Sequence, residues 1–345
     1  MPVITEARLR ELSLQILLAM KAPQDIAETV ADILVTADAK AVDSHGCRLF
    51  PMYLRQLESG MIVPTARPEI TQQDGPTTMI EGNWGFGHPT ARIAAGHAID
   101  TARKYGMGAA TVVHVSHIAR LGEYAEQIAR ENMLGLVVCN ASAVTTPYGG
   151  MKRLFGTNPL ALAVPRANGK ILLADFATSA KSVNKLTILQ QRGKTLPDGV
   201  LLDKEGYSTT DPGAFFEGGV LLPFGGYKGY ALSMFIEIIG GIMIGAGCAS
   251  LIGKHPGNGT LVMAMDITRW RPIEEFTEEL EQLLALTKAT PLAPGAEEIL
   301  LPGEIEERIE EERRHKGIPL DETIWKELRA VAAKLEMPAN LFAKS

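Results

Sequence analysis

Helical periodicity at both ends of the chain is the feature that most constrains its fold. Apolar residues recurring every three or four positions predict helices near the start of the chain, and helices are predicted over residues 5–21, 26–42, 52–59 and 322–335. A dense alternation of Glu and Arg predicts a charged surface helix over 304–316. Thr5 can cap the first helix, and Gly60 suits the left-handed residue that ends the third. Because amphipathic helices must bury their apolar faces, we expect residues 1–75 and 285–345 to pack together as one helical domain.

The centre of the chain alternates between strand and helix patterns. Runs of β-branched and apolar residues bounded by turn residues predict strands over residues 109–115, 134–139, 160–164, 171–174 and 260–265. Helices are predicted over residues 89–105 and 121–132, and again from about residue 273. The segment 193–219 is rich in Gly, Pro and Asp, which favours a loop. We therefore expect residues 76–284 to form an α+β domain.

The composition is that of a globular protein with a substantial core. The chain has 345 residues, of which 46% are hydrophobic and 21% are charged, so general disorder is not expected. The formal net charge is -6, and no basic run or basic stripe with interleaved aromatic residues occurs. Because a protein holds nucleic acid by neutralising its phosphates, we predict no nucleic-acid partner.

Cysteine usage and the first residues favour a reducing compartment. Cys47, Cys139 and Cys248 are far apart and form no CxxC pair, so neither a disulfide framework nor a thiolate metal site is predicted. Glu6 and Arg8 interrupt the first ten residues, which lack the basic and apolar pattern of a secretion signal. We therefore expect a cytoplasmic protein.

One apolar stretch, residues 230–249, has the length of a membrane span. Glu237 lies in its middle, and an unpaired carboxylate at the centre of a bilayer costs at least ~2 kcal/mol. The glycines of this stretch instead favour close packing of the backbone. We predict a buried or interface helix here and no membrane association.

Three common catalytic signatures are missing from the sequence. No GxGxxG follows an early strand, and the glycines at 82, 85 and 87 have the wrong order for dinucleotide binding in a doubly wound fold. Neither a GxxxxGK[ST] phosphate loop nor a zinc-binding HExxH motif occurs. We therefore predict neither a Rossmann fold nor a metal site.

Two histidines in polar segments are candidates for acid and base chemistry. The imidazole of His45, beside Ser44, can exchange a proton near neutral pH, and Arg48 can clamp a carboxylate with two hydrogen bonds. Ser116 and His117 follow a predicted strand, where α and β enzymes commonly place working groups. The alternative for His45 is a solvated or helix-capping side chain, and the alternative for His117 is a loop histidine whose hydrogen bonds are satisfied.

Two further segments favour the binding of phosphate or ribose. Asp175 ends a predicted strand, and the hydroxyl and backbone groups of Thr178 and its neighbours can meet ribose and phosphate oxygens. The alternative role of Asp175 is to cap the next helix. Lys228 lies among glycines at the start of the apolar helix and suits a phosphate or carboxylate, although it need not have a function.

Together these segments resemble the malate/L-lactate dehydrogenase family that lacks the Rossmann fold, a group that includes ureidoglycolate dehydrogenase and diketogulonate reductase. The resemblance covers nearly the whole chain in order. It is carried by Asp43-Ser44-His45-Gly46, Tyr53, Gly60, Ser116-His117, Gly156-Thr157-Asn158-Pro159, Asp175-Phe176-Ala177-Thr178-Ser179, Leu222-Pro223, Gly226-Tyr227-Lys228-Gly229, Leu301-Pro302-Gly303-Glu304 and Gly317-Ile318-Pro319.

The resemblance implies a fold, an assembly and a set of site residues. The implied fold is a nicotinamide-binding α+β fold on a largely antiparallel mixed sheet, with a helical domain from both termini and a homodimeric assembly. His45 matches the proton-transfer histidine of some members, and His117 that of others. The cofactor contacts are expected at Asp175, Phe176, Ala177, Thr178, Tyr227, Lys228, Gly303 and Glu304, and Thr157 is assigned to the substrate.

The arginine near His45 departs from the family pattern. The family's arginine stands four residues after this histidine, whereas here Arg48 stands three after it and Leu49 occupies the fourth place. The carboxylate clamp is therefore expected from Arg48 or from Arg120, since either guanidinium can form two parallel hydrogen bonds.

The sequence thus predicts an oxidoreductase that interconverts a small 2-hydroxy acid and its 2-oxo acid with NAD or NADP. Malate, lactate and bulkier hydroxycarboxylates are all candidate substrates. His45 is the first choice for the residue that exchanges the proton, with Ser44 and His117 beside it in the site. The alternatives are an NAD(P)H-dependent cyclic imino acid reductase and a catalytically silent cofactor-binding protein.

Overall fold

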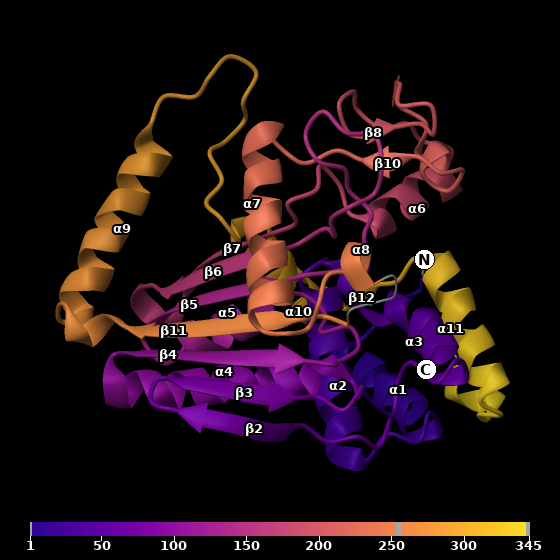
Figure 1. Cartoon of the computed structure of the whole chain (residues 1–345), viewed down its shortest axis with the longest axis horizontal. Helices are drawn as coiled ribbons and strands as arrows, with labels where there is room; N and C mark the ends of the chain where they lie inside the picture. Colours follow the sequence, from indigo (N-terminus) through magenta and orange to yellow (C-terminus); the bar gives the residue numbers. More distant parts are fainter. Residues whose placement is uncertain (1, 253–256, 343–345) are drawn as a thin grey trace.

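A mixed seven-stranded sheet forms the centre of the protein (Figure 1). The computed structural model describes residues 2–252 and 257–342. In spatial order the strands are β2 (Glu69–Asp74), β3 (Thr77–Glu81), β4 (Met107–Val113), β11 (Thr260–Asp266), β5 (Met133–Cys139), β6 (Leu160–Pro165) and β7 (Ile171–Phe176). Among these described strands, β3 and β4 are parallel and the other neighbours are antiparallel. The predicted α+β class with a largely antiparallel sheet is confirmed.

Two helices cover one face of the sheet closely. They are α4 (Gly87–Tyr105) and α5 (Gly122–Ala129), which lie behind the strands in Figure 1. A Cβ added to Gly108 of β4 would lie 2.2 Å from the carbonyl oxygen of Ala98 in α4. Helix and strand backbones therefore touch where both residues are small. Gly106 ends α4 with a φ of 88°, as expected for a residue in the left-handed region.

A single helix, α7 (Tyr227–Glu237), crosses the other face and continues as a wider turn over Ile238–Met243. The predicted continuous helix over residues 230–249 is therefore wrong in its extent. Asn158 Nδ2 donates to the buried Glu237 Oε2 over 2.8 Å, which holds α7 against the sheet where its regular part ends. Within the described part of the chain, no helix has the length and apolarity to span a bilayer.

Helices from both termini pack together at one end of the sheet (Figure 1). They are α1 (Glu6–Ala19), α2 (Gln24–Ala39), α3 (Phe50–Glu58) and α11 (Glu322–Lys334), joined by the pairing of β1 (Val3–Ile4) with β12 (Ile318–Pro319). Leu9, Ile16, Tyr53 and Leu328 belong to one buried apolar cluster. Helices from both ends of the chain therefore share one buried core. Thr5 caps α1 as predicted, because its hydroxyl accepts the Arg8 N–H over 3.3 Å.

Two more helices complete the C-terminal half. α9 (Ile273–Ala289) stands apart from the sheet in Figure 1, and a long loop returns from it to α10 (Glu304–Lys316), which contacts α2. Between β7 and α7 the chain forms α6 (Val183–Gln191) and a small sheet of β8 (Leu201–Leu202), β9 (Ser208–Thr209) and β10 (Val220–Leu221). The short helix α8 (Ala249–Ile252) follows the wide turn.

Several local predictions need correction. β2 and β3 were not expected, and β2 lies inside the region predicted to be helical. The residues of β2 are all exposed, so it lacks the alternation of apolar and polar residues that marks a half-buried strand. α6 was also missed, and residues 193–219 contain short strands rather than loop alone. β4 ends at Val113, two residues early, because His114 has a φ of 51° and cannot continue a strand.

Candidate active site

The loop that carries His45 rests directly on a buried carboxyl group. Asp38, near the end of α2, accepts the Cys47 N–H at its Oδ2 over 2.8 Å. A Cβ added to Gly46 would lie 1.8 Å from Asp38 Oδ1, so only glycine fits there. Burial raises the pKa of Asp38 to about 7. The position of His45 therefore depends on a close contact between its loop and α2.

His45 is half-buried and uncharged at neutral pH. Its Nδ1 lies 2.9 Å from the hydroxyl of Ser44. Burial, together with the nearby charges of Arg120 and Lys185, lowers the pKa of His45 to about 4. A neutral imidazole of this kind has a free nitrogen lone pair and can accept a proton.

His117 lies against His45, although the two are far apart in the sequence. Their rings stack with centroids 5.5 Å apart and planes 18° from parallel. The Nδ1 of His117 lies 3.1 Å from Tyr53 Oη and accepts the Ala119 N–H over 3.3 Å. The two histidines that the sequence proposed as alternatives therefore occupy one site.

The two candidate arginines have different surroundings. Arg48 is half-exposed, and its Nη2 donates to Gln191 Oε1 of α6 over 2.9 Å. Arg120 is buried, and its Nη2 donates to Glu126 Oε1 over 2.8 Å. Leu49, at the place of the family's arginine, is buried in the terminal core. Among the described residues, no carboxylate pairs with Arg48, so its charge is available to an anion.

The end of β7 lies beside these residues. Asp175 Oδ2 accepts the N–H of Gly122 over 2.8 Å and so anchors the start of α5, next to Arg120. Burial raises the pKa of Asp175. Farther along, the N–H and the hydroxyl of Thr178 both donate to the Thr157 carbonyl oxygen, over 2.8 and 3.0 Å. Three predicted site residues, Asp175, Thr157 and Thr178, thus lie on connected segments.

The start of α7 packs against the same segment. Phe224 N–H donates to the Thr178 carbonyl oxygen over 2.9 Å, and the rings of Phe176 and Phe224 meet edge to face at 5.8 Å. Tyr227 and Lys228, in the first turn of α7, are exposed beside this contact. The predicted cofactor segments after β7 and before α7 are therefore neighbours.

This helix start fits the pyrophosphate of a dinucleotide. Gly225 and Gly226 have φ values of 56° and 63°, so only a glycine adopts this turn without strain. In the part of the chain that the structure describes, no side chain caps α7. The first N–H groups of a helix point out of its start and favour an anion, and Lys228 in the first turn is exposed and positively charged.

Gly303 and Glu304 lie on the other side of β7. Gly303 has a φ of 80°, and a Cβ there would lie 3.1 Å from the carbonyl oxygen of Leu173. Glu304 accepts the Leu301 N–H over 2.8 Å and pairs with Lys288 at 2.6 Å. The backbone N–H and the lysine lower the pKa of Glu304 to about 2. Glu304 therefore already has structural partners in this chain.

Sequence reasoning missed several residues near the histidines. Asn184 Nδ2 donates to the Ser44 carbonyl oxygen over 2.8 Å, and Lys185 follows it in α6. Tyr53 and His88 are fully buried behind His117. A tyrosine on the apolar face of a helix needs a hydrogen-bond partner when buried, and that requirement was the available signal. No local pattern indicated α6, in which β-branched residues are mixed with polar ones.

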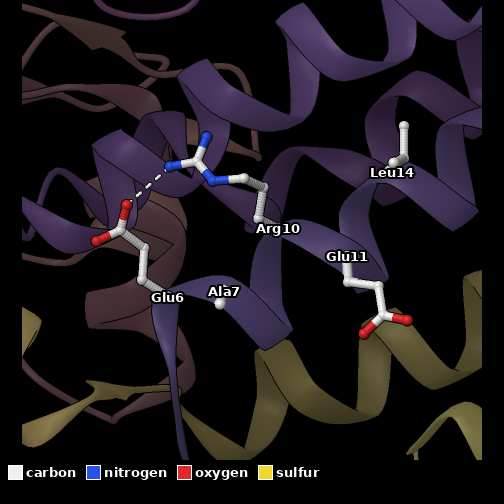
Figure 2. Close-up of a pocket in the computed structure, with 5 residues that line it drawn as sticks. All are labelled: Glu6, Ala7, Arg10, Glu11 and Leu14. Atoms are coloured by element: carbon white, nitrogen blue, oxygen red, sulfur yellow. Dashed lines mark hydrogen bonds and ion pairs between the residues drawn. The ribbon is translucent and has the colours of Figure 1, made fainter.

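Two surface hollows lie away from the candidate site. One of about 530 Å³ lies along α1, where Figure 2 shows Arg10 turned toward Glu6 at 2.7 Å. Another of about 610 Å³ lies between Ala167 and α9. None of the candidate site residues lines either hollow. Within the described residues, no three side chains of His, Cys, Asp or Glu converge as metal ligands. The chemistry of the side chains, rather than a hollow, therefore marks this site.

Comparison with known proteins identifies the family of this chain. The sequence matches the family described as malate/L-lactate dehydrogenase over residues 4–329. The chain belongs to this family. Similar proteins include sulfolactate and lactate dehydrogenases, so the protein is an oxidoreductase, as the sequence predicted.

Three relatives illustrate the range of the family. L-sulfolactate dehydrogenase of Methanothermobacter thermautotrophicus is 35% identical over 94% of this chain and 94% of its own. The structure of malate dehydrogenase from Pyrococcus horikoshii has a TM-score of 0.89 at 29% identity, covering 98% of this chain and 96% of that one. The structure of delta1-piperideine-2-carboxylate reductase from Pseudomonas syringae pvar. tomato has a TM-score of 0.85 at 28% identity, covering 96% and 100%.

Proposed function

We propose that the protein is a nicotinamide-dependent dehydrogenase that interconverts a 2-hydroxy acid and the corresponding 2-oxo acid. The observation that carries this proposal is the stacked pair of His45 and His117, and Arg48, three residues after His45, has no carboxylate partner among the described residues. Oxidation of a hydroxy acid removes a hydride from C2 and a proton from the hydroxyl group. The bound nicotinamide accepts or supplies the hydride. The side chains of this chain handle the proton and the carboxylate.

His45 is the proposed carrier of the proton. Because its pKa is lowered to about 4, it is neutral at pH 7 and ready to take the hydroxyl proton during oxidation. In the opposite direction it must first be protonated. A substrate carboxylate beside the imidazole raises its pKa, because a nearby negative charge favours the charged form.

Arg48 is the proposed anchor of the substrate carboxylate. Its guanidinium is hydrogen-bonded only to the neutral amide of Gln191 among the described residues, whereas Glu126 already neutralises Arg120. Lys185 adds a second positive charge close to His45. Thr157 lies next to Thr178 and completes the substrate side of the site in this proposal.

The cofactor is proposed to lie along the end of β7 and the start of α7. Thr178 and its predecessors Asp175, Phe176 and Ala177 form one side, and Tyr227 and Lys228 form the other. Gly303 and Glu304 flank the strand from α10. Both NAD and NADP are compatible with these residues.

The test is the decay of NADH and NADPH absorbance with purified protein. Pyruvate, oxaloacetate, 3-sulfopyruvate, phenylpyruvate and a cyclic imino acid are each offered at neutral pH. Turnover of an oxo acid supports the proposal and identifies the cofactor in the same assay. Binding of NADH without oxidation by any oxo acid would contradict it and favour a catalytically silent cofactor-binding protein.

A cyclic imino acid reductase is the second candidate. Its support is the structural likeness to delta1-piperideine-2-carboxylate reductase, whose fold covers this chain almost completely. In that reaction the proton goes to a ring nitrogen, so His45 and Arg48 keep the same roles. Faster turnover of the cyclic imino acid than of any oxo acid would select this candidate.

We also propose that the protein is a cytoplasmic homodimer. Its three cysteines are buried free thiols, as suits a reducing compartment. One face of α7 and its extension leaves large apolar side chains exposed, namely Tyr227, Phe235, Ile238, Ile242 and Met243. A continuous apolar stripe of this kind is typical of an interface, and a second copy is the proposed partner. Sedimentation of Phe235→Lys should show a monomer, whereas Phe216→Lys, on another surface, should remain dimeric.

A further inference from the structure

A tyrosine lies between two histidines behind the site. Tyr53 Oη is 3.1 Å from His88 Nε2 and 3.1 Å from His117 Nδ1. Tyr53 comes from α3 in the terminal helical domain, and His88 comes from the first turn of α4. The side chains of Tyr53 and His88 are completely buried, so each hydrogen must have a definite place in this chain of contacts.

A backbone group determines the direction of the hydrogen bonds. The Ala119 N–H can only donate, and it points at His117 Nδ1 over 3.3 Å. This nitrogen therefore carries a lone pair and no hydrogen. Tyr53 must donate its own hydrogen to the same nitrogen, because otherwise two lone pairs would face each other at 3.1 Å. Ala119 has a φ of 62°, a conformation rare for a residue with a side chain, which aims its N–H at the ring.

The tautomer of His88 follows from the same requirement. With its hydrogen given to His117, the Tyr53 oxygen must accept a hydrogen from His88 Nε2. Burial and the nearby charge of Arg92 lower the pKa of His88 to about 3, so this ring holds a single proton. Its Nδ1 is then a bare acceptor, which agrees with the lack of a hydrogen-bond partner for that buried atom among the described residues. A buried N–H without a partner would be the less favourable choice.

We propose that Tyr53 and His88 are positioning residues that hold His117 in the tautomer protonated at Nε2. His117 then presents an N–H donor to the reacting oxygen of the substrate, and cannot accept a proton at that nitrogen. His45 is left as the imidazole that takes or gives the proton. This inference rests on the proposed function only for the identity of the group that His117 meets.

The chain from His88 to His117 orients the ring and does not conduct protons. Passing a proton along it would leave His88 without either of its ring hydrogens, because no described group can supply one to its buried Nδ1. Such an anion is unfavourable in a buried site. The same geometry therefore assigns different roles to two adjacent histidines.

Nuclear magnetic resonance of the ring nitrogens tests the tautomer without any turnover. The full-length protein is labelled with ¹⁵N-histidine, and His117→Asn identifies the signals of His117. We expect the wild-type ring to show one protonated Nε2 and one unprotonated Nδ1. In Tyr53→Phe, where Nδ1 loses the Tyr53 hydroxyl and keeps the weaker Ala119 contact, both tautomers should appear. A wild-type His117 protonated at Nδ1, or a Tyr53→Phe spectrum without change, would overturn the proposal.

Kinetics provide the second measurement. Loss of one orienting hydrogen bond should lower kcat of Tyr53→Phe about tenfold with little change in KM. Tyr124→Phe is the matched control, since Tyr124 is equally buried and donates to the Ile118 carbonyl oxygen of the same loop. Its kcat should stay within about twofold. His88→Gln, which keeps an N–H donor, should retain the wild-type tautomer, whereas His88→Leu should not.

The two measurements separate this inference from the proposed function. A protein that reduces no oxo acid but shows His117 protonated at Nε2 contradicts the function and supports the positioning chain. An active enzyme in which Tyr53→Phe and Tyr124→Phe lose the same activity contradicts the positioning role alone. If Tyr53→Phe fails to fold, the spectrum of the wild-type ring still decides the tautomer.

Discussion

The two loops that meet at the site are held in opposite ways. The loop of His117 is buried, and it is held by the hydrogen bond between His117 and Tyr53 and by the ion pair of Arg120 with Glu126. The loop of His45 is half-buried and rests on Asp38, with its outer side against α6. His117 is therefore a fixed hydrogen-bond donor, whereas His45 is a group whose charge can change.

This difference has a physical reason. A histidine whose nitrogen is already occupied by fixed donors can orient a substrate but cannot easily take up a proton. A histidine beside a single hydroxyl and two positive charges can change its protonation when an anion arrives, as proposed for His45. The following predictions test this division of roles.

Removing the imidazole of His45 should have the largest effect. His45→Ala is expected to lower kcat by roughly 10²-fold to 10⁴-fold, the usual contribution of a positioned acid or base. Cofactor binding, measured by the fluorescence of NADH, should be unchanged. The control is His315→Ala on the exposed face of α10. Near-normal turnover of His45→Ala would show that another group exchanges the proton. The division of roles between His45 and His117 would then be wrong.

The fixed loop should depend on its buried ion pairs. Glu126 accepts hydrogen bonds from Arg120 at 2.8 Å and from Lys40 at 2.7 Å. Although burial opposes ionisation, these two cations lower the pKa of Glu126. Glu126→Gln leaves Lys40 and Arg120 with only their longer ion pairs, to Glu310 at 3.5 Å and to Glu123 at 3.8 Å, and should lower the free energy of unfolding by about 3 kcal/mol.

Denaturant unfolding of Glu126→Gln, followed by fluorescence, measures this loss. Glu131→Gln is the matched control, because Glu131 forms an exposed pair with Arg103 in the same region. That pair should contribute no more than about 1 kcal/mol. Equal unfolding midpoints for the two variants would show that the buried pairs do not stabilise the loop.

Replacing Arg48 should affect substrate binding more than turnover. Arg48→Leu is expected to raise KM for the oxo acid roughly 10-fold to 100-fold, since a hydrogen bond to a charged group contributes about 1.5–3 kcal/mol. Arg55→Leu, at an exposed position of α3, provides the control. If neither substitution changes KM, the substrate carboxylate must be bound by Arg120 or Lys185 instead.

A dependence of the stability on pH is expected at Asp38. Burial raises its pKa to about 7, above the value of 3.8 for an exposed carboxyl, so the folded protein favours the protonated form. Its stabilising contribution is complete below about pH 4 and is lost as the pH rises through 7. Relative to Asp38→Asn, the wild type should lose about 1.4 kcal/mol of unfolding free energy per pH unit in this window.

Thermal or denaturant unfolding of both proteins between about pH 4 and pH 8 measures that difference. The amide introduced by Asp38→Asn keeps an oxygen that can accept the Cys47 N–H, so the comparison isolates the charge. A difference in stability that does not change with pH would show that Asp38 is ionised throughout. The loop of His45 would then rest on a charged group.

Much of the fold could be predicted because its signals are local. The terminal helices follow from apolar residues at helical spacing, and the capping by Thr5 and the left-handed Gly106 follow from single residues. β2 could not be found in this way, because an exposed edge strand needs no apolar alternation. His114 ended β4 early through a backbone angle that the run of apolar residues before it did not show.

For the site, too, some features could be predicted from the sequence and others could not. The sequence by itself determined which residue types are available, including His45, His117, Arg48 and the glycines before Lys228, because motifs preserve order and spacing. Only the tertiary structure decided that the two histidine rings stack, that Arg120 is neutralised while Arg48 is not, and that Tyr53 orients His117. These relations join residues that are distant in the chain. They depend on packing and burial, which no local pattern records.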